Sequence, residues 1–109
     1  MYNIKSHSTL AIDYDDTYSL HPEVFEQVAK LFKDIGWHVL IVTARADKDN
    51  SDMPKFKNID SVIYCDGTAK MDVVDADIWI DDCPLAITHH FNSGFATPNK
   101  YVKTWLKEN

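Results

Sequence analysis

The sequence predicts an α/β protein: a three-layer, doubly wound parallel sheet that forms one domain over residues 1–109. Short apolar runs of strand length alternate along the chain with segments whose apolar residues repeat at helical spacing. Such alternation is typical of parallel strands joined by right-handed helical crossovers. A length of 109 residues supports one hydrophobic core but not a core plus an independent cap domain.

The N-terminal half contains two strand patterns with a helix pattern between them. We expect the first strand over residues 9–13. Pro22 suits the first turn of a helix, and Glu23 suits its positive end. The apolar side chains that follow repeat at helical spacing: Val24, Phe25, Val28, Leu31, Phe32 and Ile35. Gly36 closes this helix, and the continuous apolar run over residues 38–43 predicts a strand covered on both faces.

The middle of the chain is more polar. Residues 44–60 contain Pro54 and many charged side chains, which predicts a loop or one short helix and the most mobile segment of the domain. A third strand is expected over residues 61–65, because Asp66 and Gly67 then end it. The second and third strands are therefore joined by a long polar connection.

The C-terminal part of the chain contains the last predicted elements. Residues 69–74 fit a short helix, and residues 77–82 fit a fourth strand that Pro84 ends. Residues 85–91 fit either a helix or an edge strand. Pro98 opens a final helix with an apolar stripe made of Tyr101, Val102, Trp105 and Leu106.

Composition and charge limit the function classes. With 45% hydrophobic and 26% charged residues, the chain has the composition of an ordinary soluble globular protein. Its net charge of -6 disfavours, without excluding, binding to a nucleic-acid backbone, which needs clustered Lys and Arg. No apolar stretch approaches the ~20 residues that span a bilayer, and the N-terminus has no signal-peptide pattern. We therefore expect a cytoplasmic protein without a membrane partner, in which Cys65 and Cys83 are free thiols.

Carboxylates follow directly on the first predicted strand. The apolar run Leu10–Ile12 ends in Asp13, Asp15 and Asp16, and Thr17 comes next. In open α/β sheets, ligands bind at the carboxyl ends of the strands. Carboxylates crowded there repel one another, and a divalent cation is the usual way to relieve that repulsion. The first strand therefore predicts a metal-dependent site.

Further polar residues accompany the other predicted strands. Thr43 ends the second strand, Lys70 precedes the fourth, and Asp81 and Asp82 end the fourth. Taken singly, each has an ordinary explanation as a turn residue or a surface charge. Their joint order resembles the haloacid dehalogenase-like (HAD) hydrolase superfamily, and the resemblance covers about residues 9–84. The matching motifs are Asp13-Tyr14-Asp15-Asp16-Thr17, Val39-Leu40-Ile41-Val42-Thr43, Lys70 and Ile78-Trp79-Ile80-Asp81-Asp82.

The resemblance implies a Rossmann-like HAD core that hydrolyses phosphate monoesters with Mg²⁺. By resemblance, Asp13 attacks phosphorus and forms an aspartyl-phosphate, while Asp15 protonates the leaving oxygen and then deprotonates the hydrolytic water. Asp13 and Asp81 would bind Mg²⁺ through carboxylate oxygens, Asp15 through its main-chain carbonyl, and Asp82 directly or through water. Thr17 would stabilise the turn after the first strand and would not contact the substrate. An acid at position 15 favours phosphatase activity because an alkoxide leaving group needs a proton.

Three residues complete the expected site. By resemblance, Thr43 and Lys70 would hydrogen-bond the transferring phosphoryl oxygens, and Lys70 would offset their charge. Arg45 is the only arginine in the chain, and two interpretations of it carry equal weight. It contacts a phosphate or carboxylate of the substrate, or it forms a surface ion pair with acids such as Asp47 or Asp49.

The chain also departs from the family pattern. Relatives carry a cap domain after the first motif or after the third strand, and both connections are short here. A capless enzyme has an open site, in which residues 44–60, a second subunit or the substrate itself would exclude water. The expected partner is a phosphorylated small molecule or an exposed phosphate on a macromolecule, and an oligomer is compatible with this. Asp16 stands where many relatives have Gly, and we expect a structural role for it.

Two other function classes remain open. A receiver-like phosphoacceptor signalling domain has a similar length and a parallel sheet, and Asp66 would be its phosphorylated residue. Such domains need Thr or Ser after the fourth strand, where this chain has Asp81 and Asp82, and Lys after a fifth strand. The remaining alternative is a catalytically silent HAD-like protein that only binds a metal or a partner.

Overall fold

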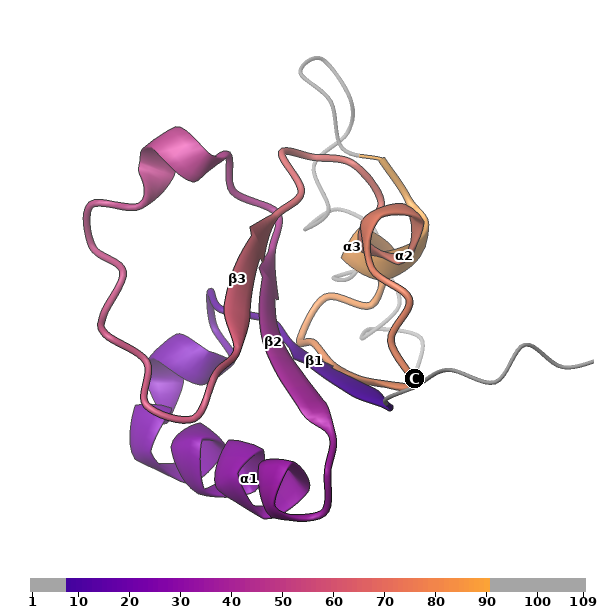
Figure 1. Cartoon of the computed structure of the whole chain (residues 1–109). Coiled ribbons are helices and arrows are strands. Elements are labelled where there is room, and N and C mark those ends of the chain that lie inside the picture. The colour runs from indigo at the N-terminus through magenta and orange to yellow at the C-terminus, as the bar shows by residue number, and fades with distance from the viewer. Residues whose placement is uncertain (1–7, 91–109) are drawn as a thin grey trace, which may run out of the picture.

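The computed structural model of the chain describes residues 8–90. Within them the chain forms a four-stranded, entirely parallel sheet with the strand order β3-β2-β1-β4 (Figure 1). The elements are, in chain order, β1 (Thr9–Ile12), the 3-10 turn η1 (Tyr18–Leu20), α1 (Pro22–Asp34), β2 (His38–Thr43), the 3-10 turn η2 (Asp47–Asp49), β3 (Ser61–Tyr64), α2 (Lys70–Val73), β4 (Ile78–Ile80) and α3 (Leu85–Thr88). The predicted α/β class with a parallel sheet is confirmed.

Several predicted elements are shorter in the structure. β4 covers only Ile78–Ile80 of the predicted strand 77–82, because the chain turns at Asp81, whose Oδ1 accepts the main-chain N–H of Cys83 at 2.9 Å. Residues 85–91 were compatible with a helix or a strand, and Leu85–Thr88 form the helix α3. The helix predicted from Pro98 lies outside the described residues.

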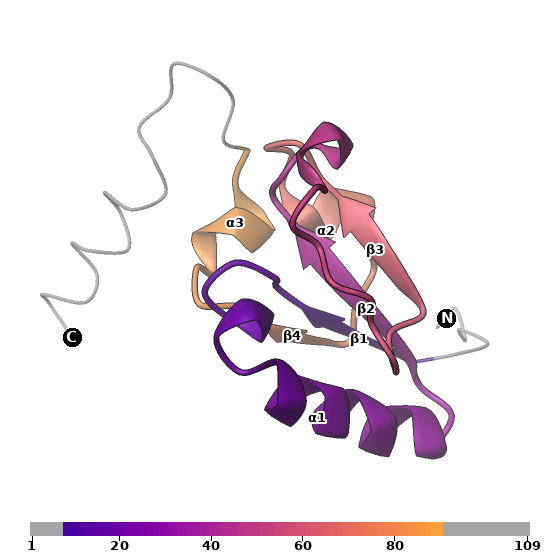
Figure 2. The same cartoon turned by 90° about the vertical axis from the view of Figure 1, so that its left-hand side faces the viewer.

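The two faces of the sheet carry separate apolar clusters. Leu10 and Ile12 of β1 pack with Ala29 of α1, whereas Ala11 points to the opposite face and packs with Val74, which follows α2. This is the alternation expected for neighbouring residues of a strand. Figures 1 and 2 show α1 along one side of the sheet and α2 on the other. Among the described helices, none is both long and apolar enough to cross a bilayer.

The connection from β2 to β3 is anchored by its second half. Apolar side chains from this part pack against the same cluster as α1: Met53, Phe56 and Ile59. Glu26 of α1 accepts the main-chain N–H groups of Lys57 at 3.2 Å and Asn58 at 2.7 Å. Part of the segment that we expected to be the most mobile is therefore tied to the core.

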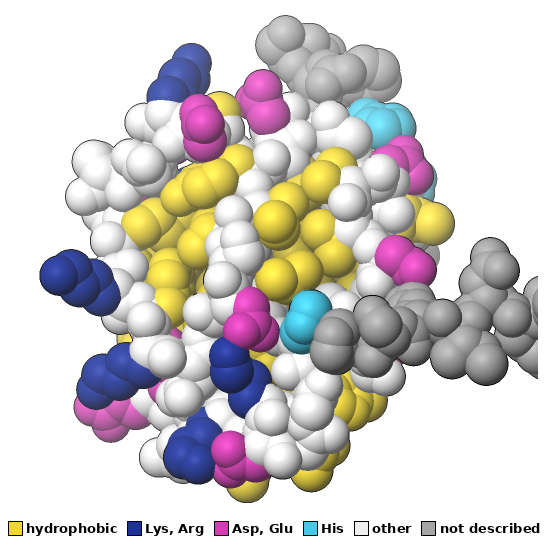
Figure 3. All heavy atoms as spheres, viewed as in Figure 1, with side chains coloured by type: hydrophobic (Ala, Val, Ile, Leu, Met, Phe, Trp, Pro, Cys, Tyr) yellow, Lys and Arg dark blue, Asp and Glu magenta, His cyan; other side chains and the backbone are white. Residues whose placement is uncertain are grey.

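β3 lies at one edge of the described sheet and pairs with β2. Its Val62 packs toward the α1 side and its Ile63 toward the α2 side. Figure 3 shows this side of the molecule, where apolar side chains gather in two patches separated by a strip of backbone and polar atoms.

The strand order places the expected ligand site at the carboxyl ends of β1 and β4. From β1 the chain moves to β2 and then to β3 on one side, whereas β4 returns to the other side of β1. Doubly wound sheets bind ligands outside the carboxyl ends of the strands, at the point where the strand order reverses. In this chain that point lies between β1 and β4.

Candidate active site

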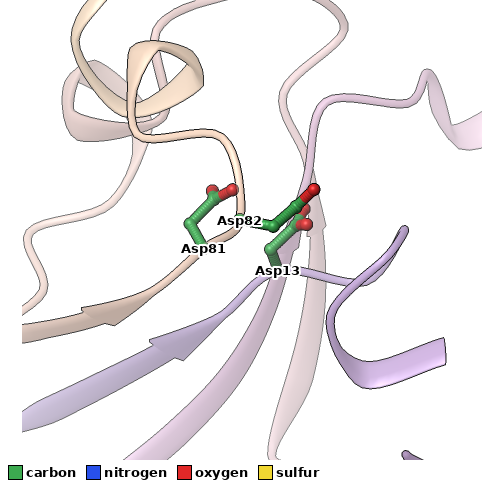
Figure 4. Close-up of side chains that lie close together, drawn as sticks. All are labelled: Asp13, Asp81 and Asp82. Atoms are coloured by element: carbon green, nitrogen blue, oxygen red, sulfur yellow. The ribbon is translucent and has the colours of Figure 1, made fainter. Parts of the chain in front are cut away.

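Three carboxylates meet at this switch point. Asp13 follows β1, and Asp81 and Asp82 follow β4. Asp13 is held beside the end of β4 because its N–H donates to the carbonyl of Ile80 at 2.9 Å. One carboxylate oxygen from each of the three side chains lies within 4.8 Å of the others, and Figure 4 shows the three side chains extending beyond the strand ends.

Lys70 is buried between two of these carboxylates. It is the first residue of α2 and is 1% exposed. Its Nζ lies 2.7 Å from Oδ1 of Asp13 and 2.6 Å from Oδ2 of Asp81. An ammonium at this depth is stable only with such paired and hydrogen-bonded partners. The two carboxylates use two of its three N–H donors, so one donor is left over from these bonds.

Thr17 ties the turn after β1 to the end of β4. Its Oγ1 lies 3.1 Å from Oδ2 of Asp13 and 3.1 Å from Oδ1 of Asp82. The same oxygen accepts the main-chain N–H of Asp82 at 3.3 Å. The predicted role of Thr17 in holding the turn is confirmed, and its contact with Asp82 extends that role across the sheet.

The electrostatics of the cluster follow from burial. Burial raises the pKa of Asp13 to about 7 although Lys70 opposes the rise, and the negative charge of Asp81 adds to it. Burial also raises the pKa of Asp81. Burial disfavours the charged form of Lys70, but Asp13 and Asp81 outweigh this effect and raise its pKa. With all groups ionised, one ammonium faces three carboxylates, so the cluster has an excess of negative charge.

The cluster therefore fits a hard divalent cation. Its donor atoms are carboxylate oxygens, the ligands that Mg²⁺ prefers, and its excess negative charge is relieved by a cation. Asp13, Asp81 and Asp82 are the residues that could hold the ion. The side chain of Asp15 does not belong to this group.

Asp15 instead faces Arg45. Nε of Arg45 lies 2.8 Å from Oδ2 of Asp15, and Nη2 lies 2.6 Å from Oδ1. Arg45 also pairs with Asp52, with 2.5 Å between Nη1 and Oδ1. Of the two interpretations of Arg45, the structure has the ion pair, but its partners differ from those we expected. Asp49 contributes only its main-chain carbonyl, at 3.0 Å from Nη1.

Thr43 lies at the carboxyl end of β2, next to β1 in the sheet. It is fully buried, and its Oγ1 accepts the main-chain N–H of Arg45 at 3.2 Å. Its main-chain carbonyl accepts the N–H of Cys65 at 2.8 Å. Cys65 and Cys83 are free, as predicted, and burial raises the pKa of both thiols, which keeps them protonated.

Asp16 occupies a special backbone position. Its φ is 60°, in the left-handed region that favours glycine. Its N–H donates to Oγ of Ser19 at 3.0 Å. The backbone explains why Gly suits this position in a turn of this kind, and it supports the structural role predicted for Asp16.

Sequence reasoning missed the contact of Asp52 with Arg45, and for His90, expected in a surface or packing role, it did not give the partners. Asp52 accepts hydrogen bonds from Arg45, and it lies in a loop whose sequence has no motif or periodicity that would indicate this contact. His90 accepts the N–H of Ala69 at 3.0 Å through Nδ1, and its Nε2 lies 3.3 Å from Oδ2 of Asp72. These contacts hold the start of α2, where Lys70 lies. Both contacts join segments far apart in the chain or depend on loop geometry, so periodicity could not indicate them.

Comparison of the chain with protein-family models gave no match, and comparisons with curated proteins and with solved structures gave no significant match. The functional interpretation therefore depends on the site itself.

Proposed function

We propose that the chain is a Mg²⁺-dependent phosphate-monoester hydrolase of the HAD-like type, with a three-layer, doubly wound core and no cap domain. One observation carries the proposal. Lys70 bridges Asp13 and Asp81 at the switch point, beside Asp82. These residues come from three separate segments of the chain, and they are the residues that the motif resemblance singles out for the nucleophile, the phosphoryl-binding lysine and the metal ligands.

Asp13 has the contacts expected of an oriented nucleophile. Lys70 holds its Oδ1, and Thr17 lies against its Oδ2, so the carboxylate cannot rotate freely. In the proposed first step, an Asp13 oxygen forms a bond to phosphorus. The bond from phosphorus to the leaving oxygen breaks, and its electron pair stays on that oxygen. The same oxygen takes up a proton from Asp15. The product is an aspartyl-phosphate on Asp13.

The second step releases phosphate. Asp15, now a carboxylate, takes a proton from water as the water oxygen attacks phosphorus, and the bond between phosphorus and Asp13 breaks. The remaining N–H of Lys70 and the hydroxyl of Thr43 would hydrogen-bond the phosphoryl oxygens, and the charge of Lys70 would stabilise the transition state. Arg45 would contact the substrate only after leaving its present partners.

A metal ion fits the same arrangement. Mg²⁺ would be held by the carboxylates of Asp13, Asp81 and Asp82 and, by resemblance, by the main-chain carbonyl of Asp15. When bound, it would neutralise negative charge on the phosphoryl oxygens. The substrate class remains a phosphorylated small molecule or an exposed phosphate on a macromolecule.

The strand order argues against the receiver-like alternative. Doubly wound sheets of that kind have the order 2-1-3-4-5, in which the third strand pairs with the first. Here β3 pairs with β2 and lies at the edge of the described sheet. Asp66, which follows β3, is therefore separated from Asp13 by a whole strand.

A steady-state assay tests the proposal. The purified full chain should hydrolyse p-nitrophenyl phosphate with Mg²⁺ and lose this activity with a chelator. Asp13→Asn should abolish turnover because the amide is a poor nucleophile, and Asp15→Asn should reduce it by about 10²–10⁴-fold, the usual worth of a general acid–base. Circular dichroism should show that both variants stay folded.

Asp16→Asn is the matched control. It removes a carboxylate from the same turn, but one that lies outside the acidic cluster. It should keep nearly full activity. Full activity of Asp13→Asn, or activity that is insensitive to metal removal, would show that the proposal is wrong.

A further inference from the structure

Arg45 binds Asp15 in the strongest geometry available to the two side chains. Nε and Nη2 of the guanidinium meet Oδ2 and Oδ1 of the carboxylate at 2.8 and 2.6 Å. Such a fork-to-fork pair fixes the orientation of a carboxylate as well as its position. The Arg45 side chain is 22% exposed and the Asp15 side chain is 49% exposed, so the pair lies at the surface and its geometry matters more here than its charge.

The other donors of Arg45 are also occupied. Nη1 donates to the carbonyl of Asp49 at 3.0 Å and to Oδ1 of Asp52 at 2.5 Å, and Nη2 donates to Oδ2 of Asp52 at 3.2 Å. Its Cζ lies 5.2 Å from the centroid of the Tyr14 ring. All five guanidinium N–H groups therefore have partners, and none is left for a substrate phosphate in this arrangement.

We propose that Arg45 is a positioning residue that acts through Asp15, and that it does not bind the substrate phosphate. This inference rests on the proposed function, in which Asp15 is the general acid–base. Arg45 holds the ionised Asp15 beside the site, in the form that must accept a proton from the hydrolytic water. The contacts to Asp49 and Asp52 keep the guanidinium in place, so the loop after β2 serves as a support for Asp15.

The pair also separates the two tasks of Asp15. A guanidinium fork binds a carboxylate through both oxygens, whereas a protonated carboxyl group has lost the charge that the fork attracts and one acceptor site. In the proposed cycle Asp15 therefore has to give up part of this pairing when it donates a proton in the first step, and it can pair with Arg45 through both oxygens again as the base of the second step.

A double-mutant cycle distinguishes positioning from phosphate binding. Kinetics of the full chain are measured with p-nitrophenyl phosphate and saturating Mg²⁺ for the wild type, Arg45→Gln, Asp15→Asn and the double variant. Arg45→Gln should lower kcat by about 10- to 100-fold, the scale of a misplaced catalytic group, and change KM less than about twofold. The double variant should be no slower than Asp15→Asn. Arg45→Lys, which offers a single point charge, should recover part of kcat.

Lys48→Gln is the control for lost positive charge. Lys48 lies in η2, on the same loop, and its loss should leave kcat and KM near their wild-type values. The inference is overturned if Arg45→Gln raises KM with kcat unchanged, or if it leaves both constants unchanged. It is also overturned if the fold-losses of kcat in Arg45→Gln and Asp15→Asn multiply in the double variant. A wild-type protein without any activity would instead overturn the proposed function, and the inference with it.

Discussion

Nζ of Lys70 lies 2.7 Å from Oδ1 of Asp13, and the pair is almost completely buried. A second carboxylate, that of Asp81, completes the contact at 2.6 Å. The ammonium of Lys70 thus joins the start of α2 to the carboxylate that follows β1, 57 residues earlier in the chain. Removing one partner of a buried ion pair leaves an uncompensated charge, which is far more costly than losing a surface pair.

Lys70→Met should therefore destabilise the protein strongly. We expect the free energy of unfolding to fall by about 3–5 kcal/mol at neutral pH, the range for a broken buried pair. Urea denaturation at equilibrium would measure it. Lys30→Met is the control, because Lys30 forms an exposed pair with Asp34 on α1, and its loss should cost about 0.3–0.5 kcal/mol. Equal losses in the two variants would contradict the buried pair.

The pKa of Asp13 predicts a pH dependence of stability. Burial raises this pKa from 3.8 to about 7, so in this window the folded state binds a proton that the unfolded state has lost. The free energy of unfolding should then fall as pH rises through the window. In metal-free buffer the wild type should lose more stability than Asp13→Asn between about pH 4.5 and pH 7.5.

The measured quantity is the difference in pH slope between the wild type and Asp13→Asn, because this difference isolates the contribution of Asp13. Asp16→Asn removes a carboxylate from the same turn and should keep the pH slope of the wild type. Parallel stability curves for the wild type and Asp13→Asn would contradict the raised pKa of Asp13.

The backbone conformation of Asp16 can be tested through stability, without an activity assay. At a φ of 60°, an L-residue is strained by about 1–2 kcal/mol relative to glycine, and a β-branched side chain is strained most. Asp16→Gly should keep activity and match or exceed the wild-type stability. Asp16→Val should lose about 1 kcal/mol or more. Urea denaturation compares the three proteins, and a valine variant as stable as the glycine variant would contradict the turn geometry.

Mg²⁺ should stabilise the folded chain through the acidic cluster. A cation that binds only the folded state raises the melting temperature, and it binds more weakly at acid pH because Asp13 must first lose its proton. Thermal unfolding with and without Mg²⁺ should show a shift for the wild type and little shift for Asp81→Asn. Asp47→Asn, in the exposed turn η2, should retain the full shift. A shift that survives in Asp81→Asn would place the ion elsewhere.

Much of the sheet could be predicted because its information is local. The run His38–Thr43 has the composition of a strand buried on both faces, and β2 has these bounds. Gly36 marked the end of α1, and its φ of 93° is of the kind that glycine adopts freely. β4 was predicted too long because the expected strand included the acids on either side of the apolar run Ile78–Ile80, and the chain turns at Asp81, where a side-chain oxygen accepts the N–H of Cys83.

The candidate site could be predicted only in part. Residues at strand ends are brought together by topology, so Asp13, Asp81 and Asp82 could be grouped before any geometry was known. The partners of Arg45 could not, because Asp52 reaches it from a loop whose course depends on packing by residues such as Phe56. The pairing of Lys70 with two carboxylates also depends on depth, and a sequence does not distinguish a buried lysine from a surface one.

The central claim is that Asp13 carries the phosphoryl group during turnover. Acid quenching of the full chain during hydrolysis of p-nitrophenyl phosphate, followed by peptide mass spectrometry, tests this directly. We expect a peptide containing Asp13 to gain the mass of one phosphoryl group, and we expect no such peptide from Asp13→Asn. Active hydrolysis without a phosphorylated peptide, or with the phosphoryl group on another residue such as Asp66, would contradict the account.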